Sequence, residues 1–158
     1  MVEDAPPLCR FVLRGRPVAG FGPSLPTAPR QVACEDGRAA LWLGPDEWLL
    51  LAPLADAAAI AAALAEADSL VEVSDAFAAL LLSGPEAARL LSSGCPLDLH
   101  PSAFPPGTAT RTLLGRAGIT LWHRPDDSWH LETARSLVSY VRAFLMESAR
   151  GLPAGAPA

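Results

Sequence analysis

The chain has no lysine and little charge of either sign. All twelve basic residues are arginine, 18% of the 158 residues are charged, and the net charge is −5. The arginines form no basic stripe, which argues against a nucleic-acid partner. The 51% of hydrophobic residues argues against a disordered chain and is enough for one domain over residues 1–158.

We expect neither a leader nor a membrane-spanning segment. The N-terminus is acidic and has no apolar leader core, and the apolar run at 57–65 is too short to cross a bilayer. The chain has three cysteines, Cys9, Cys34 and Cys95. Because their number is odd and they lie far apart in the sequence, they fit reduced thiols better than a disulfide framework. We therefore expect a cytoplasmic protein with no membrane partner.

The sequence also lacks the motifs of common cofactor sites. It has no glycine-rich dinucleotide fingerprint and no phosphate loop. His123 and His130 have no neighbouring cysteine or carboxylate cluster at zinc spacing, so we interpret them as partly exposed strand positions. We predict no catalytic, cofactor-binding or metal-binding residue in this chain.

What is present is a succession of strand and helix patterns typical of an α+β fold. Strands are predicted at 9–13, 38–43, 48–52, 70–73, 77–82, 111–114, 119–123 and 128–132. Helices are predicted at 54–67, from Ser83–Glu86 to Gly94, and at 135–149. This order predicts two similar lobes, 8–75 and 76–150, each a mainly antiparallel sheet with helices on one face. Residues 1–7 and 151–158 are expected to be frayed tails.

Details within these elements lead to further expectations. Leu49 to Leu51 run without alternation, so their strand should be covered on both faces. If the last strand pair is joined by a four-residue turn, Trp122 lies opposite Trp129. Asp46 and Glu47 are interpreted as solvated turn residues, and the four tryptophans as core or interface anchors.

Cys95 is the most plausible nucleophile, because Asp98 and His100 are close in sequence. Thiol catalysis needs a base within hydrogen-bond reach and a lowered thiol pKa. The alternative is a small buried cysteine at a helix end, with Asp98 capping a turn. The sequence favours this alternative, because proximity along the chain does not supply the geometry.

Several long motifs occur in order from about Phe11 to Ala149: Leu43–Leu50, Val73–Phe77, Leu82–Pro85, Gly94–Pro101, Phe104–Gly107, Thr110–Gly115 and Arg135–Leu137. Together they resemble the gamma subunit of heterotetrameric sarcosine oxidase. The same segments are more distantly similar to the folate-binding aminomethyltransferase (glycine cleavage T-protein) family. Members of that family carry an acidic pair just after a glycine turn, whereas Gly118–Trp122 has no carboxylate.

The resemblance implies a non-catalytic structural subunit with alpha, beta and delta partners. Such a complex oxidises sarcosine to glycine, forms hydrogen peroxide and passes the one-carbon unit to tetrahydrofolate. It uses FAD, FMN, NAD and tetrahydrofolate, bound in its other subunits. The isolated chain could self-associate through its unpaired partner surface. The alternative is a stand-alone folate or small-molecule binding module.

The proline-rich loop from Cys95 to Gly107 is long for a compact domain, and such loops often bind a partner. We expect a partner subunit to contact this region. The residues predicted at that interface are Cys95, Asp98, His100, Phe104, Arg111 and Arg135.

Overall fold

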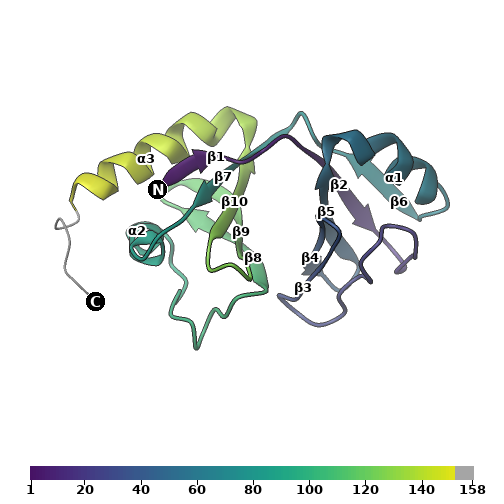
Figure 1. Ribbon diagram of the computed structural model, residues 1–158, viewed down its shortest axis with the longest axis horizontal. Helices are drawn as coiled ribbons and strands as arrows, with labels where there is room; N and C mark the ends of the chain where they lie inside the picture. Colours follow the sequence, from purple (N-terminus) through teal and green to yellow (C-terminus); the bar gives the residue numbers. More distant parts are fainter. Residues whose placement is uncertain (152–158) are drawn as a thin grey trace.

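Two five-stranded antiparallel sheets lie face to face in the computed structural model, which describes residues 1–151 (Figure 1). The N-terminal sheet has the order β3-β4-β5-β2-β6, with β2 Leu8–Arg14, β3 Val32–Glu35, β4 Arg38–Gly44, β5 Glu47–Pro53 and β6 Ser69–Glu72. The C-terminal sheet has the order β1-β7-β10-β9-β8, with β1 Val2–Asp4, β7 Phe77–Leu82, β8 Thr108–Leu114, β9 Ala117–His123 and β10 Trp129–Ala134.

Helices cover the outer face of each sheet, which gives four layers (Figure 1). Helix α1, Ala57–Ala63, packs on the N-terminal sheet, and α2, Ala87–Ser92, and α3, Val138–Arg150, pack on the C-terminal sheet. Single 3-10 turns, Leu54–Asp56 and Arg135–Leu137, precede α1 and α3. The predicted α+β fold, with two similar lobes and helices on one face of each sheet, is confirmed.

The core has three apolar layers, because each sheet is covered on both faces. Trp48, Phe11 and Ile60 lie between the N-terminal sheet and α1, and Leu80, Leu131 and Val141 lie on the helical side of the C-terminal sheet. The layer between the sheets contains Ala39, Leu41, Leu49, Leu51, Ala109 and Trp122. Leu49 and Leu50 therefore point into different layers and are both buried, as their unbroken apolar run predicted.

The N-terminal segment differs from the expected frayed tail. Val2–Asp4 form β1, which pairs antiparallel with Leu80–Leu82 of β7, and Asp4 also contacts Arg142 of α3. The segment is ordered because its backbone pairs with the free edge of β7 and because Val2 packs against the C-terminal core. Of the expected C-terminal tail, residues 152–158 lie outside the described residues.

Other differences concern turns. The β3–β4 hairpin was not predicted, although its turn is Asp36-Gly37, with φ of +48° and +77° at its two central residues. The β8–β9 turn has two residues, because Leu114 pairs with Ala117. The first helix is shorter than the predicted 54–67, since α1 ends at Ala63.

The β9–β10 turn places the tryptophans one position away from the prediction. It runs through five residues, closed by a hydrogen bond from Arg124 N to Ser128 O, with Asp127 at a φ of +64°. Trp129 consequently lies opposite His123, and Trp122 opposite His130. The extra residue therefore puts the two indoles in different layers.

Two glycines allow close packing where the end of α2 and the β8–β9 turn meet α3. A Cβ on Gly94 would lie 2.5 Å from the ring of Phe144, and a Cβ on Gly115 would lie 2.5 Å from the hydroxyl of Tyr140. Gly115 N donates to Gly94 O at 3.0 Å, so the end of α2 and the β8–β9 turn share this contact. The predicted helix stop at Gly94 thus also allows close packing of the two segments.

Removing residues 1–5 should destabilise the C-terminal lobe by about 1–3 kcal/mol, because β7 loses its hydrogen bonds to β1. Hydrogen exchange should then accelerate in β7 and β10, with β2 and β5 of the same molecule as the internal control. Unchanged protection in β7 would show that β1 contributes nothing to the lobe.

Candidate functional site

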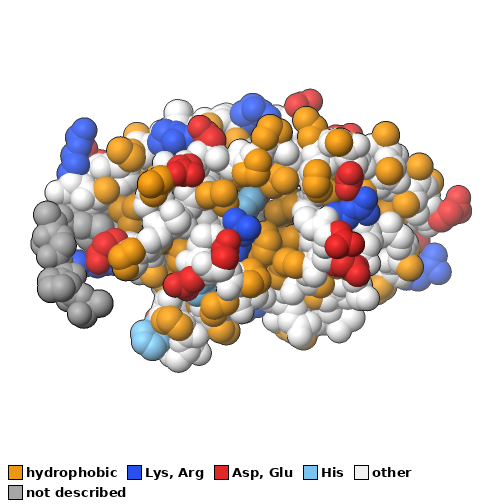
Figure 2. Space-filling model, viewed as in Figure 1, with side chains coloured by type: hydrophobic (Ala, Val, Ile, Leu, Met, Phe, Trp, Pro, Cys, Tyr) orange, Lys and Arg blue, Asp and Glu red, His pale blue; other side chains and the backbone are white. Residues whose placement is uncertain are grey.

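A cleft of about 490 Å³ opens between the two sheets. Figure 2 shows hydrophobic side chains gathered in a hollow between the lobes, with arginine and acidic side chains beside it. The N-terminal lobe and the segment before it contribute Pro6, Leu8, Cys34, Glu35, Asp36, Gly37, Arg38, Ala39 and Leu51. The C-terminal lobe contributes Leu81, Trp122, Arg124, Pro125, Asp126 and His130. This volume lies in the range of small-molecule sites.

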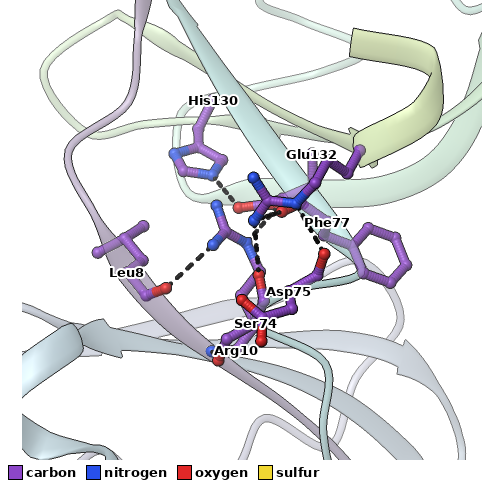
Figure 3. A network of polar contacts seen from close by, with 8 residues as sticks. Leu8, Arg10, Ser74, Asp75, Phe77, His130 and Glu132 are labelled. Carbon is purple, nitrogen blue, oxygen red and sulfur yellow. Dashed lines mark hydrogen bonds and ion pairs between the residues drawn. The ribbon is translucent and has the colours of Figure 1, made fainter.

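A buried polar network joins the lobes beside this cleft (Figure 3). Arg10 of β2 donates through Nε to Glu132 Oε2 of β10 at 2.7 Å, and His130 Nε2 lies 2.7 Å from Glu132 Oε1. The three residues are between 1% and 6% exposed. His130 and Glu132 are two positions apart on one strand, so both face the opposite sheet.

Backbone groups complete the network around Arg10. Its Nη1 donates to the Leu8 carbonyl at 3.0 Å, and its backbone N–H donates to Ser74 Oγ at 3.0 Å. Ser74 lies in the segment that connects β6 to β7 and donates in turn to Glu72 at 2.8 Å. The guanidinium is therefore fixed by Glu132 and by the Leu8 carbonyl, and the backbone of Arg10 is fixed by the segment that connects the lobes.

The network keeps Glu132 ionised. Burial raises the pKa of its carboxyl, but the hydrogen bond from His130, followed by the hydrogen bond and charge of Arg10, outweighs burial and holds the pKa below its ordinary value. A buried carboxylate with two hydrogen-bonding partners forms a stable arrangement, whereas either partner left alone would be costly.

A second ion pair joins the two sheets near the other end of β2. Glu47 of β5 accepts hydrogen bonds from both Nη atoms of Arg111 on β8, at 3.1 and 2.5 Å, and one from Arg14 at 3.1 Å. The hydrogen bond from Arg111 lowers the pKa of Glu47 more than burial raises it. The expectation that Glu47 is a solvated turn residue is wrong, because its side chain is 12% exposed and pairs across the interface.

Of the six residues predicted for a partner interface, two are buried within this chain. Phe104 is fully buried in the C-terminal core and so cannot act as a surface anchor, and Cys95 is 7% exposed. His100 and Asp98 lie together on the exposed loop, where Asp98 Oδ1 accepts from His100 N at 2.9 Å. Arg111 holds Glu47, and Arg135 donates through Nε to the Asp75 carbonyl at 2.7 Å.

The groups suggested for thiol chemistry have other partners. Cys95 Sγ lies 3.8 Å from Thr112 Oγ1, whereas His100 Nδ1 lies 2.8 Å from Ser102 Oγ. The hydrogen bond from His100 N to Asp98 is the turn cap that the alternative interpretation of Cys95 predicted.

The two strand histidines are buried, not partly exposed as predicted. His123 is 1% exposed, stacks on Trp129 with 4.1 Å between ring centroids, and contacts the Phe104 carbonyl and Asp127. His130 is 4% exposed. Both lie on strands covered on two sides, which the polarity of their residue type did not indicate.

Sequence reasoning missed Arg10 and Glu132, although a signal was present. Each is a charged residue flanked by buried residues within a strand, Cys9-Arg10-Phe11 and Leu131-Glu132-Thr133. Charged residues are rarely buried unless they are paired, so the two opposite charges could have been matched with each other.

Two further searches cover the described part of the chain. Residues 1–151 contain no group of three or more His, Cys, Asp or Glu side chains placed to hold a metal ion. Among the helices of this part, none combines the length and hydrophobicity needed to cross a bilayer.

Comparison with known sequences identifies one family. Residues 17–150 match the model of the sarcosine oxidase gamma subunit family. The chain is 38% identical over 117 residues to the sarcosine oxidase subunit gamma of Arthrobacter sp., with 72% of this chain and 58% of the relative covered. It is 35% identical over 134 residues to the subunit of Corynebacterium sp. (strain U-96), with 82% and 65% covered. The matches thus span less than two thirds of these relatives.

Comparison with solved structures agrees. A chain of the heterotetrameric sarcosine oxidase from Corynebacterium sp. U-96, in complex with pyrrole 2-carboxylate, matches with a TM-score of 0.86 and 30% identity, covering 99% of this chain and 87% of that one. The glycine cleavage system aminomethyltransferase T from Bartonella henselae matches with a TM-score of 0.66 and 14% identity, covering 94% and 46%. The second likeness shows a shared fold.

Glu132→Gln should lower the free energy of unfolding by about 3–5 kcal/mol, because it leaves the buried Arg10 guanidinium without its countercharge. Glu47→Gln is the matched control and should cost under about 1 kcal/mol, because Arg111 is half exposed. Urea unfolding of both variants tests this. Equal losses would contradict a special role for the buried pair.

Acid should weaken the fold partly through Glu132. Its pKa is lower in the folded chain than the ordinary value of 4.5, so its stabilisation is complete above about pH 4.5 and is lost as the pH falls through the lower folded pKa. Glu132→Gln should therefore flatten the acid side of the stability curve. An acid side as steep as that of the parent would exclude Glu132 as a contributor.

Proposed function

This chain belongs to the sarcosine oxidase gamma subunit family, and on that premise we propose that it is the non-catalytic structural gamma subunit of a heterotetrameric sarcosine oxidase. The observation that carries this proposal is the TM-score of 0.86, over 99% of the chain, to a chain of such an oxidase. Its partners in the proposal are alpha, beta and delta subunits, in the cytoplasm, and its three free thiols fit that compartment.

The proposed complex oxidises sarcosine with O2. Sarcosine, O2 and tetrahydrofolate give glycine, hydrogen peroxide and methylene-tetrahydrofolate, so the oxidised methyl carbon leaves on the folate. FAD, FMN, NAD and tetrahydrofolate belong to other subunits in this proposal.

The placement of polar side chains supports a structural role for this subunit. The buried charged groups Arg10 and Glu132 bond to each other between the lobes, and Glu47 holds Arg111 in the same way. Cys95 is buried beside Thr112, and the ring of His100 bonds to Ser102. These groups thus connect parts of the subunit.

The alternative is a stand-alone module that binds folate or another small molecule. The cleft between the lobes, with Trp122 in its wall, favours this alternative. The position where aminomethyltransferases are expected to carry an acidic pair is occupied here by β9 residues such as Thr120, which is buried and has no carboxylate. We therefore rank this function second.

The decisive experiment is purification of the tagged chain from its own cells, with mass spectrometry and a visible absorption spectrum. We expect larger chains, a flavin spectrum and sarcosine oxidation in the same fraction. A colourless chain recovered alone, under conditions that preserve weak complexes, would overturn the subunit proposal and favour the binding module.

Cys95→Ala in the same complex serves as the control for a non-catalytic role. Activity should remain within about two-fold of the parent, because the side chain is a small buried group next to Thr112. A loss of several orders of magnitude in an intact complex would assign chemistry to this subunit.

A further inference from the structure

We propose that the cleft between the two sheets binds a small organic ammonium ion that carries at least one N–H, with His130 as its hydrogen-bond acceptor and the carboxylates of Glu35 and Asp36 at its rim. The proposal concerns this chain alone and does not depend on the assembly proposed above.

The acceptor follows from the bond between His130 and Glu132. A carboxylate can only accept, so Nε2 of His130 donates at 2.7 Å and, in the neutral ring, Nδ1 keeps its lone pair. His130 lines the cleft and Glu132 does not. Figure 3 shows the second ring nitrogen on the side away from Glu132. Within residues 1–151, Nε2 is the ring nitrogen of His130 that has a hydrogen-bond partner, so Nδ1 is an unused acceptor for a ligand that donates. Trp122 Nε1, in the same cleft wall, is a buried donor without a partner in this part of the chain and leaves room for an acceptor on the same ligand.

The walls suit the apolar body of such a ligand. Leu8, Leu51 and Leu81 line the cleft together with the indole of Trp122, which lies 5.8 Å from the His130 ring. An aromatic face also attracts cations, and the Arg124 guanidinium already lies 5.7 Å from the Trp122 ring. The cleft therefore offers apolar contact close to the acceptor.

The charged residues at the rim favour a ligand with a positive charge. The arginines near the cleft have carboxylate partners: Arg10 pairs with Glu132, Arg38 with Asp56 and Arg124 with Asp126. Glu35 and Asp36, in contrast, are exposed at the β3–β4 turn and form no ion pair in the part of the chain that the structure describes. Their uncompensated charge attracts cations into a cleft with low-dielectric walls.

The test uses the full chain and three probes of similar shape. Benzylammonium carries the charge and the N–H, benzyltrimethylammonium the charge without an N–H, and phenylacetate the opposite charge. Calorimetric titration should show benzylammonium binding at least ten-fold more tightly than either of the others.

Cys34 reports where the probe binds. It is exposed and lines the cleft, whereas Cys9 and Cys95 are buried and provide an internal reference. Saturating benzylammonium should slow alkylation of Cys34 by iodoacetamide at least three-fold.

Two double variants test the rim without touching the buried network. Glu35→Gln with Asp36→Asn should weaken benzylammonium binding at least three-fold. Glu66→Gln with Glu147→Gln makes the same change in net charge at exposed positions that do not line the cleft and should leave binding within two-fold.

Any of four results would overturn the proposal: no binding, equal binding of the three probes, binding without protection of Cys34, or equal effects of the two double variants. The same alkylation can be measured in an assembled complex without any probe. If Cys34 no longer reacts with iodoacetamide there, a partner covers the cleft, and this result also excludes a small-molecule site.

Discussion

Burial of both faces of both sheets is the constraint on which the rest of this structure depends. Each central strand has to divide its side chains between a helical layer and the layer between the sheets, so a polar residue on either side needs a partner. Arg10 and Glu132 supply that partner to each other from opposite sheets. The pair requires one alignment of the two sheets, because a shift of either strand would leave two unpaired charges in an apolar layer.

The two lobes repeat one plan. The two sheets have the same strand order when the C-terminal sheet is read from its β8 edge. The N-terminal order is β3-β4-β5-β2-β6, and the C-terminal order is β8-β9-β10-β7-β1, so β1 occupies the position that β6 occupies in the other sheet. The chain crosses between lobes directly after each of these two strands. The crossings have equivalent hydrogen bonds, from Ala5 N to Ala79 O and from Val73 N to Arg10 O. The N-terminal segment is thus an integral part of the C-terminal lobe, and local sequence could not show this because its partner lies about eighty residues away.

Most of the fold could be predicted from local patterns, because strand runs and helix stripes are recorded in neighbouring residues. The predicted lobes, the strands on either side of residues 44–47 and the buried run at Leu49–Leu51 followed from such patterns. The Asp36-Gly37 turn carried a strong hairpin signal that was not used. The candidate site could not be predicted in the same way, because His130 and Glu47 acquire their burial and partners from the other sheet. Both residues are polar, so their sequence suggested exposure. They are buried because the two lobes pack against each other.

The two ion pairs between the sheets differ in burial, and the cleft lies beside the deeper one. In the pair of Glu47 and Arg111 the arginine is half exposed, so water screens its charge and little energy is lost if the two separate. Arg10, Glu132 and His130 lie deep, so their positions are set by hydrogen bonds that are costly to break. The cleft adjoins this deep group, and His130 belongs both to the network and to the cleft wall. The network that joins the lobes therefore also fixes the orientation of the His130 ring. Any ligand of the cleft would meet a preorganised group rather than one that it has to order.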